Sequence, residues 1–297
     1  TASAGNSGSV SVGTGAATNG KSGSIRVTVG AGNTGDGGGV WLFAGQTTAD
    51  NKVGGMVSIR GGVSYTTTAL AKGGSVEIGG GAGSGHSGGA VSVLTGYGSS
   101  TSSGSLTIRT MNAGTTGVSG RLSFSSGTAS VGNSGSVSVG TGAATNGKGG
   151  SIRVTVGAGN TAVGGCVSVV AGQSTVSSGG SIGVASGYGT ATSSGIVSVA
   201  SANAGDIGVS GSLEFCSGTT STGNSGLVRV TTGSATAGKG GSISLVVGSG
   251  DTRDGGSICI EAGETTADTS AGGMVGIRAG FGSHAAGGKG GAIEVHG

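Results

Sequence analysis

Histidines and cysteines, the side chains that most often bind metals or act as nucleophiles, are rare in this chain. The histidines are His86, His284 and His296, and the cysteines are Cys166, Cys216 and Cys259. No two of them lie at a metal-ligand spacing, and three widely spaced cysteines do not make a disulfide framework. The acidic residues are scattered rather than gathered as a glycoside-cleaving enzyme requires. We therefore predict that the protein is not an enzyme and has no catalytic, metal or cofactor-binding site.

The composition excludes several further classes of protein. Gly accounts for 76 of the 297 residues, Pro is absent, and 8% of residues are charged. Collagen is excluded because Gly does not recur at every third residue. Disorder is not expected, since regular aliphatic pairs run through the chain. A net charge of +3 without a basic cluster argues against a nucleic-acid partner. No apolar stretch reaches membrane-spanning length, so we predict no membrane span.

A short repeat runs along the whole chain. Nineteen times, mostly at intervals of fifteen residues, a glycine is followed by a variable, an apolar, a variable and an apolar residue. We number each repeat from the residue after its leading glycine. Positions 2 and 4 are aliphatic or Phe in all nineteen repeats, and position 7 is Gly in sixteen of the eighteen complete ones. Alternation of this kind is typical of a strand with one buried face, and a fixed short period is typical of stacked structural repeats.

The repeat predicts an all-β fold, a single parallel β-solenoid (β-helix) of about nineteen coils with a thin, flattened cross-section and Gly corners. Positions 2 and 4 would form two internal apolar columns, and glycines with positive φ would turn the corners. Examples of the expected core columns are Val10, Val12, Ile25, Val27, Val137, Val139, Ile152 and Val154. Examples of the expected corners are Gly8, Gly15, Gly23, Gly30, Gly135 and Gly142.

Charged residues suggest how neighbouring coils are aligned. Opposite charges occupy the same position of adjacent repeats in several pairs, among them these four: Lys21 with Asp36, Glu214 with Arg229, Lys239 with Asp254, and Glu261 with Arg278. Side chains one ladder step apart attract when their charges are opposite. We therefore expect these four pairs to form ladder ion pairs.

The domain organisation that follows is one continuous solenoid over residues 1–297. A longer period divides it into super-repeat blocks 1–127, 128–218 and 219–297, because residues 1–7 return at 128–134 and, more loosely, at 219–225. Whole repeats are gained or lost between the blocks. That is how a repeat protein changes length without disturbing its neighbouring contacts.

The Gly-Ser-apolar rhythm, as in residues 150–157, resembles Gly/Ser-rich repeat proteins of microalgal cell surfaces and the repeat regions of bacterial and phage adhesins. The resemblance implies an extracellular or cell-surface, non-enzymatic role as a filament or surface-layer subunit. The expected partner is the protein itself, joined end to end or laterally, because a sparsely charged surface is poorly protected against self-association. A polysaccharide or mineral surface is a second expected partner.

Two alternatives remain open at this point. One is an ice-binding (antifreeze) β-solenoid, which needs regular ranks of outward Thr. Position 10 carries Thr in several repeats, among them Thr18, Thr48 and Thr145, but the rank is interrupted. The other is an adhesin stalk that binds polysaccharide.

Overall fold

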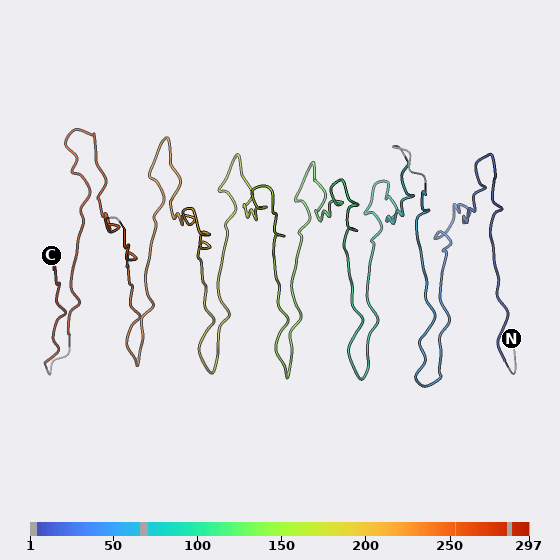
Figure 1. The fold of residues 1–297 in the computed structure, drawn as a ribbon, viewed down its shortest axis with the longest axis horizontal. Coiled ribbons are helices and arrows are strands. Elements are labelled where there is room, and N and C mark those ends of the chain that lie inside the picture. Colours follow the sequence, from blue (N-terminus) through green and yellow to red (C-terminus); the bar gives the residue numbers. More distant parts are fainter. Residues whose placement is uncertain (1–4, 66–70, 253, 284–286, 297) are drawn as a thin grey trace. The chain divides into compact units, whose positions relative to one another are not determined.

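The chain consists of extended stretches that alternate with reversals (Figure 1). The computed structural model describes residues 5–65, 71–252, 254–283 and 287–296. Within these ranges there is no helix and no β-strand. The alternating apolar sequence is therefore extended locally, but the extended stretches do not join into a sheet.

The predicted all-β solenoid, or β-helix, is consequently wrong. A parallel sheet requires neighbouring strands to exchange hydrogen bonds along their length. The described residues form nine backbone–backbone hydrogen bonds, and eight of them join two glycines of one repeat across the base of a loop. The ninth runs from Ser270 N to Ala267 O, within a turn. The backbone hydrogen bonds given for the described ranges therefore close individual loops and form no ladder between extended stretches.

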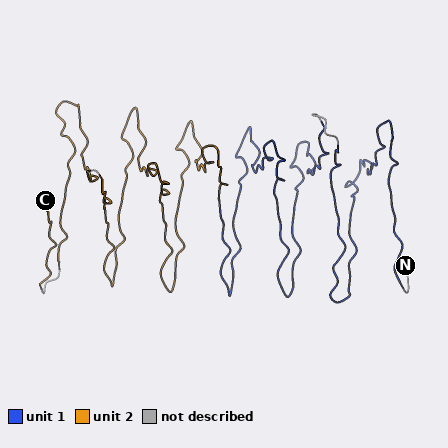
Figure 2. Ribbon diagram, in the orientation of Figure 1, with its two compact units in different colours: residues 1–153 blue, residues 154–297 orange. Residues whose placement is uncertain are grey.

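The chain divides into two units, Thr1–Arg153 and Val154–Gly297 (Figure 2). The same local pattern recurs in each unit: an extended segment at positions 1 to 6, a loop that starts near position 7, and a return to the next leading glycine. The division falls inside the repeat led by Gly150, so it coincides with none of the super-repeat blocks. Those blocks remain a prediction from the sequence.

Loop tips have a common position within the repeat. The chain bends near positions 10 to 12, for example at residues 18–20, 145–147 and 160–162. Several tips end on a glycine with positive φ, among them Gly117 (127°) and Gly132 (97°). None of the six glycines expected at corners has a positive φ. The left-handed backbone therefore occurs at loop tips, where the chain reverses, and not at the six glycines that we predicted as coil corners.

The expected apolar core is also not formed. No hydrophobic side chain is buried among the described residues. The eight residues that we assigned to core columns are between 55% (Ile25) and 94% (Val10) exposed. Half-buried positions belong instead to small residues at loop bases and within loops: Gly61, Gly98, Thr110, Ala171, Ser174, Gly189 and Ala279. The physical reason is that an aliphatic pair becomes buried only when another layer covers it, and each extended segment here lacks a paired neighbour.

The sequence predicts no membrane span, and the structure bears on helices that could form one. In the ranges that the structure describes, no helix has the length and apolar character needed to cross a bilayer.

Candidate interaction surface

Side chains that could bind a metal are dispersed over the described part of the chain. This part has no pocket, and no group of three or more His, Cys, Asp or Glu residues that could hold a metal ion. All three cysteines are free and exposed. The thiol of Cys259 lies 3.4 Å from Oε1 of Glu261, two residues further along the same extended segment. His284 lies outside the described residues.

Each loop closes at what we call a neck, where positions 6 and 7 of a repeat approach the glycine that leads the next repeat. The simplest type is the glycine neck, in which the N–H of the leading glycine donates to the carbonyl of the position-7 glycine. Gly55 N to Gly45 O (2.7 Å) and Gly180 N to Gly172 O (2.9 Å) are examples. This bond needs two close backbones without side chains between them, which is the situation in which Gly is required.

A threonine neck closes the loop with a side chain. The hydroxyls of Thr14, Thr141 and Thr232, each at position 6, donate to the carbonyl oxygens of Gly23, Gly150 and Gly241, and all three distances are 3.3 Å. The same contact thus recurs once in each of the three super-repeat blocks. It stabilises a loop of eight residues in each case.

A valine neck follows each threonine neck in the sequence. A Cβ placed on Gly38, Gly165 or Gly256 would lie 2.8, 2.6 or 2.7 Å from Cγ1 of Val29, Val156 or Val247. Such distances are shorter than carbon atoms tolerate, so any larger residue at these glycines would require the valine side chain to shift. The order threonine, valine, glycine neck over three successive repeats is therefore the same in all three blocks.

The most extensive surface feature is the set of apolar pairs, by which we mean the residues at positions 2 and 4 of each repeat. They alternate with variable residues on extended segments, so both members of a pair lie on one side of the chain. Val137 and Val139 are 60% and 76% exposed, and Ile152 and Val154 are 57% and 74% exposed. Large exposed apolar areas mark interaction sites on soluble proteins. The apolar pairs are therefore the candidate interaction surface.

The expected corner glycines have two different environments. A Cβ on Gly23 would contact Thr14 at 3.3 Å, and one on Gly135 would contact Cβ of Ser126 at 3.5 Å, so both glycines lie at necks. A Cβ on the other four would meet nothing within 4 Å: Gly8, Gly15, Gly30 and Gly142. These four glycines therefore do not act as the corners that we predicted, and of the six only Gly23 and Gly135 have a neighbour at a neck.

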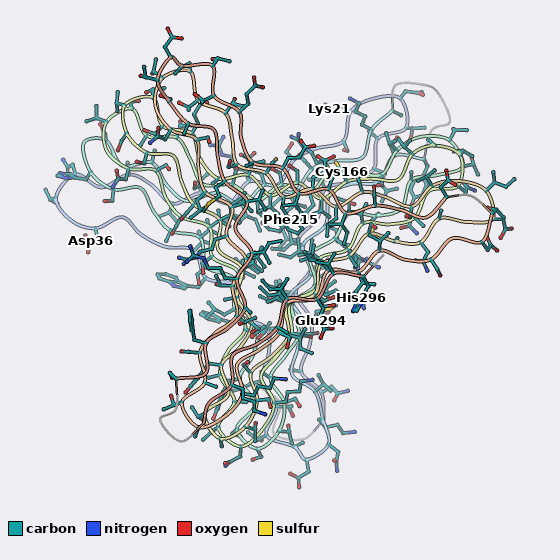
Figure 3. The ribbon with its side chains drawn as sticks, turned by 90° about the vertical axis from the view of Figure 1, so that its left-hand side faces the viewer. Lys21, Asp36, Cys166, Phe215, Glu294 and His296 are labelled. Carbon is teal, nitrogen blue, oxygen red and sulfur yellow. The ribbon has the colours of Figure 1, made fainter. Side chains whose placement is uncertain are left out.

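The four expected ladder pairs are not brought together within the chain. Lys21 and Asp36 lie at the outer ends of different loops of unit 1 (Figure 3). Among the described residues the one ion pair joins His296 Nε2 and Glu294 Oε2 at 3.5 Å, with both side chains exposed. The eight charged side chains of the predicted pairs therefore form no salt bridge in the single chain, and their pairing remains a prediction.

The necks are the structural feature that the sequence interpretation missed. The signal was present, because position 6 reads Thr, Val and Ala in three successive repeats of every block, starting at Thr14, Thr141 and Thr232. The interpretation of the sequence rests on the large residues at positions 2 and 4 and assigns no role to position 6. Comparison of the chain with protein-family models, with curated proteins and with solved structures finds no match.

Proposed function

We propose that this chain is a non-enzymatic structural protein that associates with copies of itself to form a filament or surface layer. One observation carries the proposal. The single chain has an accessible surface of 29364 Å², whereas a compact folded protein of 26.9 kDa would expose about 11000 Å². The difference between the two areas is about 18000 Å². The side chains of the described apolar pairs contribute to this excess. Removing apolar area from water contributes about 25 cal/mol per Å², so a complex in which a partner covers this surface is favoured.

A second copy of the chain is the partner that fits this surface. The apolar pairs recur mostly every fifteen residues, so two copies have matching spacings along their whole length. Repulsion between copies is small because only 25 of the 297 residues are charged, 14 of them basic and 11 acidic. In the part of the chain that the structure describes, the backbone N–H and C=O groups of the extended segments form no ladder, and unpaired extended edges favour association.

The proposed location is outside the cell or at its surface. This part of the proposal is supported by the resemblance to Gly/Ser-rich surface repeats and by a surface of Ser, Thr and Gly. Contact with a polysaccharide or a mineral remains a secondary prediction.

Sedimentation of the purified chain over a range of concentrations tests self-association. We expect a critical concentration above which most of the protein pellets, with filaments or sheets visible by negative-stain microscopy. A chain that remains monomeric at every concentration, from micromolar to millimolar, would contradict the proposal. Binding of an apolar dye provides a second readout, because dye fluorescence should fall as copies cover the apolar pairs.

A further inference from the structure

The charged residues of the four predicted pairs form no salt bridges with one another within the single chain, and they can indicate how a second copy is placed. Oε1 of Glu261 accepts a hydrogen bond from the Cys259 thiol, two residues earlier in the same segment. Lys21 and Asp36 each occupy position 13 of their repeat, but the loops that carry them point in different directions (Figure 3). The described part of the structure contains no salt bridge for any of the four pairs. The charges are therefore available to another molecule.

The alignment of two parallel copies decides which charges meet. In an unshifted pair each residue lies opposite its own counterpart, so Lys21 faces a lysine and Asp36 faces an aspartate. Like charges placed directly opposite each other are destabilising. In a pair shifted by one repeat, Lys21 of one copy faces Asp36 of the other. The same shift matches Glu214 with Arg229.

The shifted alignment is favourable along the whole chain. It brings together the four predicted pairs of opposite charge, including Lys239 with Asp254 and Glu261 with Arg278. At no position do adjacent repeats carry charges of the same sign. The apolar pairs remain aligned as well, because positions 2 and 4 are apolar in all nineteen repeats.

We propose that copies of this chain associate in parallel with a shift of one repeat, so that each repeat of one copy lies against the following repeat of the next. This inference rests on the proposed self-association and specifies its register. The two copies use different surfaces in such a contact, which makes it heterologous. A heterologous contact that does not close into a ring continues into an open filament.

Two charge-reversed variants test the register. The first reverses the leading member of every pair: Lys21→Asp, Glu214→Arg, Lys239→Asp and Glu261→Arg. The second reverses the following member of every pair: Asp36→Lys, Arg229→Glu, Asp254→Lys and Arg278→Glu. Each variant retains the net charge of +3, because two lysine–aspartate exchanges offset two glutamate–arginine exchanges. A change in assembly therefore cannot come from net charge.

Each variant alone places like charges opposite each other at all four positions of the shifted contact. We expect its critical concentration to be roughly tenfold above that of the wild type in low salt. An equal mixture of the two variants restores opposite charges at every step, because the copies alternate along the filament. The mixture should assemble at nearly the wild-type concentration, which two misfolded variants could not do. Lys148→Asp is the matched control, since the next repeat carries neutral Val163 at that position.

Zero-length cross-linking gives an independent readout on the unmodified protein. Filaments are formed from equal amounts of ordinary and ¹⁵N-labelled chain and treated with a carbodiimide, which joins amines to adjacent carboxylates. The shifted register predicts mixed-label peptides that link Lys21 to Asp36 and Lys239 to Asp254.

The outcomes separate the two proposals. Wild-type protein that does not assemble overturns self-association and the register with it. Wild-type protein that assembles while either variant alone assembles equally well overturns the register and leaves self-association intact. Filaments without mixed-label links between these residues have the same consequence. Weakened variants, a restored mixture and the two mixed-label links support the shifted register.

Discussion

At the scale of single residues, the threonine neck makes the most specific claim. The hydroxyl of Thr141 donates to Gly150 O at 3.3 Å across an exposed loop of residues 142–149. An exposed hydrogen bond of this length lies at the weak end of the usual 0.5–1.5 kcal/mol. The loop contains Lys148, which provides a point of attack for trypsin.

We predict that Thr141→Val speeds tryptic cleavage after Lys148 about twofold to fivefold, because cleavage follows the population of opened loops. Valine has nearly the shape of threonine but lacks the donor. Quantitative mass spectrometry of a digestion time course measures the rate. Cleavage after Lys21, in the loop closed by Thr14, serves as an internal control and should not change. An unchanged rate at Lys148 would mean that the hydroxyl does not restrain the loop.

A second residue-scale feature is a left-handed backbone without glycine. Asn51 (φ 58°) and Thr269 (φ 64°) occupy position 13 of two longer, related repeats. Asparagine tolerates this region of φ, whereas a β-branched residue is strained there. Both loops contain an N–H to hydroxyl bond, from Ala49 to Thr47 Oγ1 (3.2 Å) and from Ala267 to Thr265 Oγ1 (3.3 Å). The two loops share the sequence Thr-Thr-Ala-Asp before this position, and Asn51 stands where the second loop has the strained Thr269.

We predict that Thr269→Asn stabilises its turn by about 1 kcal/mol. The N–H of Ser270 donates to Ala267 O within that turn, so its hydrogen exchange should slow by roughly fivefold. The reciprocal change, Asn51→Thr, should speed tryptic cleavage after the adjacent Lys52. If Thr269→Asn and Asn51→Thr both slow, or both speed, the opening of their loops, backbone strain at position 13 does not determine the stability of these loops.

At the scale of elements, the extended segment with its apolar pair is the unit that has to be covered. Val137 and Val139 belong to one such segment and are mainly exposed in the single chain. Burying a valine side chain contributes about 1.5 kcal/mol. Ser136 and Ser138 flank the same valines at the variable positions.

We predict that replacing both valines by serine raises the critical concentration for assembly at least tenfold, because two side chains lose their gain from burial. Pelleting assays measure the change. Ser136→Ala combined with Ser138→Ala, on the same segment, should leave the critical concentration within about twofold of wild type. Equal effects of the two double substitutions would contradict a role for the apolar pair in particular.

The elements also show which part of the architecture the sequence could predict. Alternation at positions 1 to 4 is typical of a strand, because period two is a local property of the chain, but the described residues contain no strand. Whether Val10 and Val12 are buried depends on what lies across from them, which alternation does not encode. Glycines at positions 7 and 15 were compatible both with coil corners and with necks. The contact between Val156 and Gly165 distinguishes the two, and only the three-dimensional structure reveals it.

At the scale of the whole molecule, a large exposed surface and a low density of charged residues both favour the proposed self-association. The single chain exposes nearly three times the surface of a compact protein of its mass. If copies associate as proposed, each chain gains stability from its partners in the way that single members of a repeat array gain it from their neighbours. Assembly should therefore be accompanied by a negative heat-capacity change, as folding is, although it occurs between molecules.

The last prediction concerns this heat-capacity change. Burial of apolar surface lowers the heat capacity by about 0.45 cal/mol/K per Å², and burial of polar surface raises it by about 0.26. If assembly removes the excess surface, the heat-capacity change should be negative and about 2–3 kcal/mol/K per chain. Calorimetric dilution of assembled protein through its critical concentration, repeated at several temperatures, measures this slope.

The same argument predicts that assembly weakens on cooling, because the hydrophobic driving force falls as temperature decreases. Filaments formed at 37 °C should partly dissolve near 4 °C and form again on warming. A heat-capacity change near zero, with filaments indifferent to cold, would indicate contacts made by polar groups alone. The apolar pairs would then remain exposed in the assembly, and the central physical reason for self-association would be lost.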